Sequence, residues 1–99
     1  MIDGIFDSTM TSLERGLSHA TKAQEVIAQN IANAQTPGYV AKKFDDVLEH
    51  AVERRNGAGV NLEEEMSDMA LNNNRHAAYL KLMASKLAIL RTVISQGRK

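Results

Sequence analysis

The sequence predicts an all-α protein: two long amphipathic helices packed as an antiparallel coiled-coil-like hairpin, with a short helix in the connection. Apolar residues recur at alternating spacings of four and three along both ends of the chain, which is typical of helices that pack in this way. The apolar residues are aliphatic, aromatics make up only 4%, and there is one proline. We expect a single helical domain, 1–99, with helices at 3–35 and 61–96. Residues 36–60 form a turn, a short helix and a loop.

The first predicted helix carries a continuous apolar seam. Asp3, Asp7 and Ser8 are alternative N-caps. Gln24 takes the one seam position that is not apolar or small. The other seam residues are Phe6, Met10, Leu13, Leu17, Ala20, Ile27, Ile31 and Ala34. This regularity predicts that one face of the helix packs against another helix.

A sharp turn ends the first helix within the sequence NIANAQTPGY, residues 30–39. Proline restricts Thr36 to extended backbone, and Pro37-Gly38 fits the two central positions of a type II turn. Asn33 is placed to bond free carbonyls at the helix end. The next stretch has Phe44, Val47, Leu48, Ala51 and Val52 at helical spacing. It predicts a helix over about 42–55 that stops at Asn56-Gly57.

The last segment predicts the second long helix. Asn61 is its expected cap, and Glu63, Glu64 and Glu65 are expected to be a solvated first turn near the positive end of the helix dipole. The predicted seam, with pliable methionines in it, contains Leu62, Met66, Met69, Asn73, His76, Leu80, Met83, Leu87, Leu90 and Ile94. Across both helices, the residues we expect to contribute most to packing are Leu13, Leu17, Ile27, Ile31, Leu80, Leu87 and Leu90.

An antiparallel pairing of the two seams predicts a polar layer at mid-length. If Leu13 lies near Leu87 and Ala34 near Met66, then Gln24 comes next to Asn73 and His76. Such a layer would specify register at some expense in stability. The alternative is that these side chains face water.

No residue pattern indicates catalysis, a metal or a cofactor. The chain has no cysteine, and its basic and acidic residues balance at 12 each, which argues against a nucleic-acid surface. His19 and His50 lack clustered partners and are expected on the surface. We find no nucleophile elbow or phosphate loop, and we expect no enzyme. No cleavable signal or apolar run of about 20 residues is visible, so no membrane span is expected.

Two blocks of the chain resemble the proximal rod proteins of the bacterial flagellar basal body, within the wider superfamily of rod and hook axial proteins. They are IFDSTMTSLERGLSHATKAQEVIAQNIANAQTPGY and NGAGVNLEEEMSDMALNNNRHAAYLKLMASKLAILRTVI. The pattern N-I-A-N-x-x-T-P-G-Y alone indicates the superfamily. The closing helix, with its short preceding connection, indicates the rod group. Residues 40–60 are shorter than the family's usual connection, which puts any inserted β-rich region in doubt.

The resemblance implies a structural subunit. Its terminal helices would assemble helically with copies of itself and other rod subunits into the shaft that crosses the periplasm and transmits torque from motor to hook. It also implies export through the flagellar type III apparatus, by way of rod-base and export-gate components, without a cleaved signal peptide. The export gate would read Phe6 and Met10, which also belong to the seam. The assembly motif would comprise Asn30, Ala32, Asn33, Thr36, Pro37, Gly38 and Tyr39.

The residues leave a second function open. Two long helices in so small a chain also suit a cytoplasmic helical adaptor or chaperone that acts as a dimer. A closed dimer at all concentrations would favour the adaptor, and polymer-like behaviour would favour the rod subunit.

Overall fold

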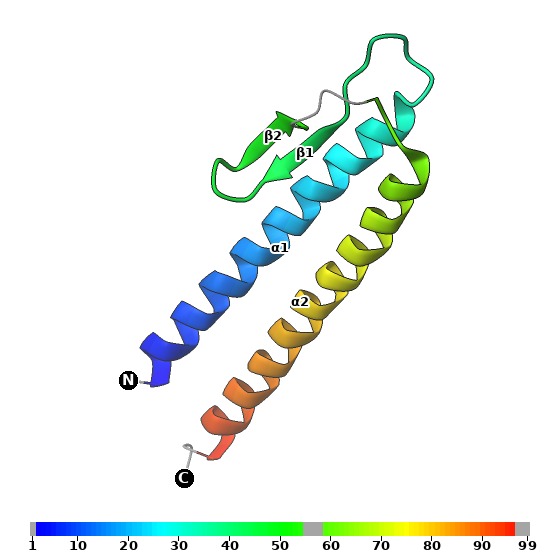
Figure 1. Cartoon of the computed structure of the whole chain (residues 1–99). Coiled ribbons are helices and arrows are strands. Elements are labelled where there is room, and N and C mark those ends of the chain that lie inside the picture. Colours follow the sequence, from blue (N-terminus) through cyan, green and yellow to red (C-terminus); the bar gives the residue numbers. More distant parts are fainter. Residues whose placement is uncertain (1, 55–58, 97–99) are drawn as a thin grey trace.

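Two long antiparallel helices dominate the structure, a computed structural model that describes residues 2–54 and 59–96. The elements are α1 (Ile2–Ala32), β1 (Lys42–Asp45), β2 (His50–Glu53) and α2 (Leu62–Gln96). The helices lie side by side, with the chain termini at one end and the turn at the other (Figure 1). The molecule is elongated, 67 × 22 × 15 Å. The prediction of a mainly helical protein with two long helices is confirmed.

The turn after α1 has the predicted chemistry. Nδ2 of Asn33 donates to the Gln29 carbonyl at 2.9 Å, and this carbonyl also accepts the backbone N–H of Asn33 at 3.0 Å. The Tyr39 N–H then donates to the Thr36 carbonyl at 3.2 Å, and Gly38 has φ +78°. A hydrogen bond across four residues with positive φ at the third matches a type II turn.

The start of α2 is also capped as predicted. Oδ1 of Asn61 accepts the Glu64 N–H at 3.2 Å, and the Asn61 carbonyl accepts the Glu65 N–H at 2.9 Å. Carboxylates at Glu63, Glu64 and Glu65 occupy the first turn. An N-cap side chain and acidic residues together satisfy the free N–H groups and the dipole at this end.

The connection corrects the all-α prediction, because residues 42–53 form an antiparallel β-hairpin and not a helix. Lys43 pairs with Val52, and Phe44 pairs with Ala51. Asp45 and His50 close the ladder on either side of a four-residue loop. The expected stop at Asn56-Gly57 lies outside the described residues.

Aspartate at the loop start explains why the hairpin forms. Oδ1 of Asp45 accepts the N–H groups of Val47 and Leu48, both at 2.9 Å, and the Asp45 carbonyl accepts the Glu49 N–H at 2.7 Å. Glu49 takes φ +58° to reverse the chain. Side-chain bonds of this kind compete with helix formation, so the apolar spacing alone misled the prediction. Val47 is 90% exposed and faces no core.

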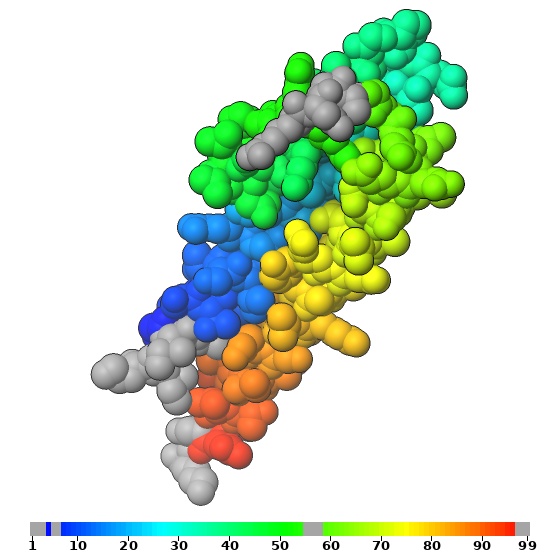
Figure 2. Space-filling model, in the orientation of Figure 1, coloured from blue at the N-terminus to red at the C-terminus, as the bar shows by residue number. Residues whose placement is uncertain are grey.

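The hairpin lies along α1 and closes a small core. Phe44 and Ala41 are buried with Leu13, Ala20, Val26 and Ile27. In Figure 2 the hairpin covers the upper half of α1, while the lower half of the helix pair continues beyond it. No described helix is long and apolar enough to cross a membrane.

The helices pack tightly at Gly16. A Cβ placed there would lie 2.4 Å from Cζ of Tyr79, so the glycine leaves the space that the Tyr79 ring occupies. This contact places Gly16 opposite Tyr79, and a second contact places Asn30 opposite Glu65. The expected register, with Leu13 near Leu87 and Ala34 near Met66, is therefore shifted.

Candidate functional site

A cluster of polar side chains, with a fully buried pair at its centre, joins all the elements at the turn end of the molecule. Asn30 of α1 and Glu65 of α2 are both 0% exposed. Nδ2 of Asn30 lies 3.0 Å from both carboxylate oxygens of Glu65 and donates to them. Two helices that are far apart in the sequence are thus joined by a bond that water does not reach.

Asn30 also holds the chain that leaves the turn. Its Nδ2 donates to the Lys42 carbonyl at 2.8 Å, and its Oδ1 accepts the Lys42 N–H at 3.0 Å. The Tyr39 hydroxyl donates to the same Oδ1 at 3.0 Å. One amide side chain therefore pairs with the backbone of β1 as another strand would, which satisfies groups that are costly to bury alone.

Arg54, just after β2, supplies the cation for the buried carboxylate. Its guanidinium donates to Oε1 of Glu65 at 2.6 Å and also pairs with Glu64. Asp68 lies 3.5 Å from the same Nη2. A buried carboxylate needs both a counter-charge and hydrogen bonds, and Arg54 and Asn30 provide them. We name Asn30, Tyr39, Arg54 and Glu65 the polar cluster.

The sequence-based expectation that Glu65 is solvated is wrong. Glu63 and Glu64 are exposed, but Glu65 faces α1. Its position was detectable, because Glu65 precedes Met69 by four residues and Asn72 by seven, as a seam residue does. Arg54 gave no comparable signal, since only the folded hairpin brings it to α2.

The structure divides the proposed assembly motif between the interior and the surface. Asn30 is buried, and Tyr39 is half-buried with its hydroxyl in the polar cluster. Asn33 accepts a bond from the Thr36 hydroxyl at 3.1 Å. Ala32, Thr36, Pro37 and Gly38 are exposed. The exposed part of the motif forms the end of the rod-shaped molecule, above the polar cluster.

The predicted polar layer at mid-length is present, but one of its residues differs from the prediction. Asn72, not Asn73, faces α1: it is 6% exposed and donates to the Ala20 carbonyl at 2.7 Å and to Oε1 of Gln24 at 3.1 Å. Asn73 is exposed, and His76 is half-buried. These residues border a shallow hollow of about 370 Å³ between the helices. The rotation of α2 by one residue follows from the shifted register.

Because of the same rotation of α2, only some of the predicted packing residues lie in the seam between the helices, and the others are exposed. On α1, Leu13 and Ile27 are buried, and Leu17 and Ile31 are half-buried. On α2, Leu90 is half-buried, but Leu80 and Leu87 are 48% and 47% exposed and lie outside the seam with α1. The side chains of α2 that the fold buries at least in part at seam spacing are Glu65, Met69, Asn72, His76, Tyr79, Met83, Lys86 and Leu90.

Large apolar side chains of α2 remain exposed in two rows. The back row contains Leu62, Met66, Leu80, Leu87 and Ile94. The hairpin-side row contains Leu71, Leu82, Ile89 and Val93. At 100° per residue the rows lie on opposite sides of the stripe that faces α1. Leu71 of the hairpin-side row borders the groove beneath the hairpin. Asn73 lies seven residues from both Met66 and Leu80 of the back row, and it borders the hollow on the opposite side of the helix pair.

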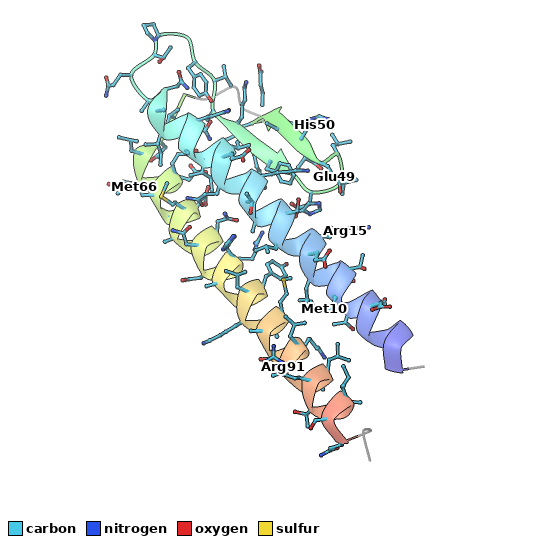
Figure 3. All side chains as sticks on the ribbon, turned by 180° about the vertical axis from the view of Figure 1, so that it is seen from behind. Met10, Arg15, Glu49, His50, Met66 and Arg91 are labelled. Carbon is cyan, nitrogen blue, oxygen red and sulfur yellow. The ribbon has the colours of Figure 1, made fainter. Side chains whose placement is uncertain are left out.

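A second cluster holds the tip of the hairpin on α1. Nε2 of His19 lies 3.1 Å from Oε1 of Glu49, and its Nδ1 lies 3.8 Å from Oδ1 of Asp46. The hydrogen bond from His19 is the main cause that lowers the pKa of Glu49 from 4.5. The His19 ring also packs on Phe44 at 5.6 Å between centroids. His19 is thus not the free surface histidine that we expected, and Figure 3 shows Glu49 beside α1.

The proposed export residues lie near the start of α1. Met10 is half-buried, and the side chain of Phe6 lies outside the described residues. Among the described residues, no group of three or more histidine or acidic side chains is placed to hold a metal ion. The contacts of the site residues hold the backbone of the connection in place and join the two helices. The two apolar rows of α2 remain exposed.

Residues 10–39, which span most of α1 and its turn, match the family model described as flagella basal body rod protein. The chain is similar to flagellar basal body rod proteins. It is 29% identical to the flagellar basal body rod protein FlgB of Bacillus subtilis (strain 168), in an alignment of 127 positions that covers 95% of this chain and 98% of the relative. That family consists of structural rod proteins and not of enzymes, in agreement with the expectation from the sequence.

The alignment also bears on the connection. It is longer than this chain of 99 residues, so the Bacillus protein has residues without a counterpart here. That agrees with a shortened connection. The comparison does not favour the adaptor alternative.

Proposed function

We propose that this protein builds the shaft of the flagellar basal body by packing its two helices against those of neighbouring subunits. The observation that carries the proposal is the pair of apolar rows on α2. Nine large apolar side chains of that helix are at least 40% exposed. Exposed apolar rows of this extent are typical of protein interfaces, and the family is one of rod subunits.

The placement of the rows favours an open assembly. If two neighbours contact a subunit through different surfaces, the contact is heterologous and can repeat along an axis. The back row and the hairpin-side row lie on opposite sides of α2, so each subunit has two different apolar edges. An elongated molecule with two such edges suits a shaft.

The polar cluster has a supporting role in this proposal. It fixes the angle between the helices and the exposed turn, so the apolar rows keep one geometry when subunits meet. Preorganised surfaces lose less entropy on association than flexible ones. We propose copies of this chain and other rod subunits as the partners, and the periplasmic part of the basal body as the place of assembly.

Export is proposed to follow the flagellar type III route without signal cleavage. Phe6 and Met10 are the candidate recognition residues, with rod-base and export-gate components as partners. Replacing Met10 with Ser should lower secretion, with Ala88→Ser, a change at an exposed position of α2 outside both apolar rows, as the control. Equal secretion of both variants would remove Met10 from the proposal.

Deletion and localisation test the function directly. Cells that lack this protein should lose motility, and a tagged copy should restore it and appear in purified basal bodies by immunoelectron microscopy. A tagged copy that restores motility but is absent from basal bodies would contradict the proposal.

A further inference from the structure

The tip of the hairpin displays apolar side chains that the fold does not use. Residues 45–49 read Asp-Asp-Val-Leu-Glu. Val47 is 90% exposed and Leu48 is 56% exposed. Turns are usually polar because they face water, so two adjacent aliphatic side chains at this position have no evident role in the isolated chain.

The tip is also rigidly held. Asp45 accepts two backbone N–H groups of the loop at 2.9 Å, His19 holds Glu49 at 3.1 Å, and Arg54 fixes the hairpin base to Glu65. Bonds thus surround Val47 and Leu48, whose own side chains face solvent. Rigid display of a small apolar group lowers the entropy cost of binding.

The C-terminal half of α2 also exposes apolar side chains, and its charge is opposite to that of the hairpin tip. Residues 81–96 contain Lys81, Lys86 and Arg91 and no acidic residue, whereas the tip has three carboxylates and no base. Leu87 and Ile94 of the back row are 47% and 53% exposed there, with Arg91 exposed beside them. An acidic apolar tip and a basic apolar row match in both charge and surface chemistry.

We propose that the hairpin tip of one copy binds the back row of α2 of a second copy, with Val47 and Leu48 against Leu87 and Ile94 and with Asp46 facing Arg91. This inference rests on the proposed function, since it names one contact between subunits in the shaft. The occupant is a second copy because this chain itself carries both complementary surfaces.

The tip cannot make this contact within its own chain. It lies beside His19, and Tyr79 lies opposite Gly16. Leu87 is eight residues further along α2, about 12 Å at 1.5 Å per residue, and the row is on the side of α2 opposite the hairpin. Neighbouring copies must therefore be staggered along the long axis, and the contact repeats without closing.

Cysteine pairs test the contact, since the chain has no cysteine of its own. The variant Val47→Cys/Leu87→Cys should form a ladder of disulfide-linked dimers, trimers and larger oligomers when basal bodies are oxidised and analysed on non-reducing gels. The Cα atoms of a disulfide lie within about 7 Å, so the bond reports close contact. The matched control is Val47→Cys/Ile89→Cys, which places the second thiol on the hairpin-side row.

The ladder separates the possible outcomes. A ladder with Leu87→Cys and none with Ile89→Cys supports the proposal. Assembly of the cysteine variants into basal bodies without a ladder, or a ladder with Ile89→Cys alone, would overturn it and leave the proposed function standing. Absence of the unmodified protein from basal bodies would instead mean that the proposed function has failed.

Charge exchange provides an independent test. Asp46→Arg and Arg91→Asp should each lower incorporation into basal bodies several-fold, and the double variant should restore most of it. Thermal melting of the purified variants shows whether the chain still folds. Folded single variants that incorporate normally would contradict the pairing.

Discussion

Asn30 uses both ends of its amide to connect three parts of the chain. Its Nδ2 reaches Glu65 of α2 at 3.0 Å and the Lys42 carbonyl at 2.8 Å, while its Oδ1 accepts from Tyr39 and from the Lys42 backbone. Because the residue is 0% exposed, no water can replace these partners. The side chain therefore determines where the chain enters β1 after the turn.

Removing Arg54 should lower the free energy of unfolding, because the buried Glu65 carboxylate loses its counter-charge. Arg54→Met leaves Glu65 in the interior without a cation, and we expect the free energy of unfolding to fall by about 3 kcal/mol. The double variant Arg54→Met/Glu65→Leu should recover most of that loss, because no uncompensated charge remains. Urea unfolding followed by circular dichroism measures both effects.

Arg75→Met is the matched control for this prediction. Arg75 is an exposed arginine of the same groove, so its loss should change the free energy of unfolding by less than about 0.5 kcal/mol. Equal effects of the Arg54 and Arg75 variants would show that Glu65 does not depend on Arg54.

Gly16 gives a steric prediction. In Gly16→Ala the new methyl would meet the Tyr79 ring at 2.4 Å, so the ring must move and lose packing. We expect a net loss of about 1 kcal/mol in unfolding free energy, after the helix propensity gained from alanine. Gly4→Ala, where no atom lies within 4 Å, should be neutral or stabilising in the same thermal melt. A Gly16 variant as stable as the Gly4 variant would refute close packing here.

Individual residues were predictable where local chemistry decides the outcome. Asn33, Gly38 and Asn61 act at helix ends and turns through bonds to neighbours in the sequence, and the structure places them as expected. Glu65 and Arg54 depend on contacts between distant segments. A glutamate in the first turn of a helix is expected to face water, unless it is known which side of that helix packs against its partner.

At the scale of elements, the hairpin shows how tertiary structure overrides spacing. The apolar residues of 42–53 are spaced as on one face of a helix. The segment nevertheless forms a hairpin, because Asp45 closes a turn and Arg54 pairs with the buried Glu65. A short isolated helix is marginal in water, so these bonds decide the structure. The long helices were predictable because their seams repeat over many turns, and an error of one residue in phase leaves the helix itself unchanged.

The attachment of the hairpin tip should depend on pH through Glu49. Its pKa is lowered from 4.5, chiefly by the hydrogen bond from His19. The stabilisation is therefore present above the unfolded-state pKa and is lost as the pH falls through the lowered folded-state value. A carboxyl NMR titration should give a midpoint for Glu49 below 4.5, which His19→Gln moves back toward 4.5. An unchanged midpoint in that variant would contradict the attachment.

For the whole molecule, the balance between buried and exposed apolar surface is the decisive property. The core of the described chain consists of small clusters along α1, whereas α2 buries Glu65 and Asn72 and exposes much of its leucine and isoleucine. A small chain with so narrow a core gains stability when partners cover the remaining apolar surface. The packing residues Leu80 and Leu87 thus belong to the surface available for partners.

The most direct measurement is incorporation of Leu87→Asp into basal bodies, compared with Ser85→Asp, which adds the same charge at an exposed polar position of the same helix. Because Leu87 is 47% exposed, the purified Leu87→Asp chain should melt close to the unmodified protein. In cells that lack the native copy, basal bodies with complete rods should form with Ser85→Asp and be absent with Leu87→Asp. Normal rods and motility with folded Leu87→Asp would contradict assembly through the apolar rows of α2.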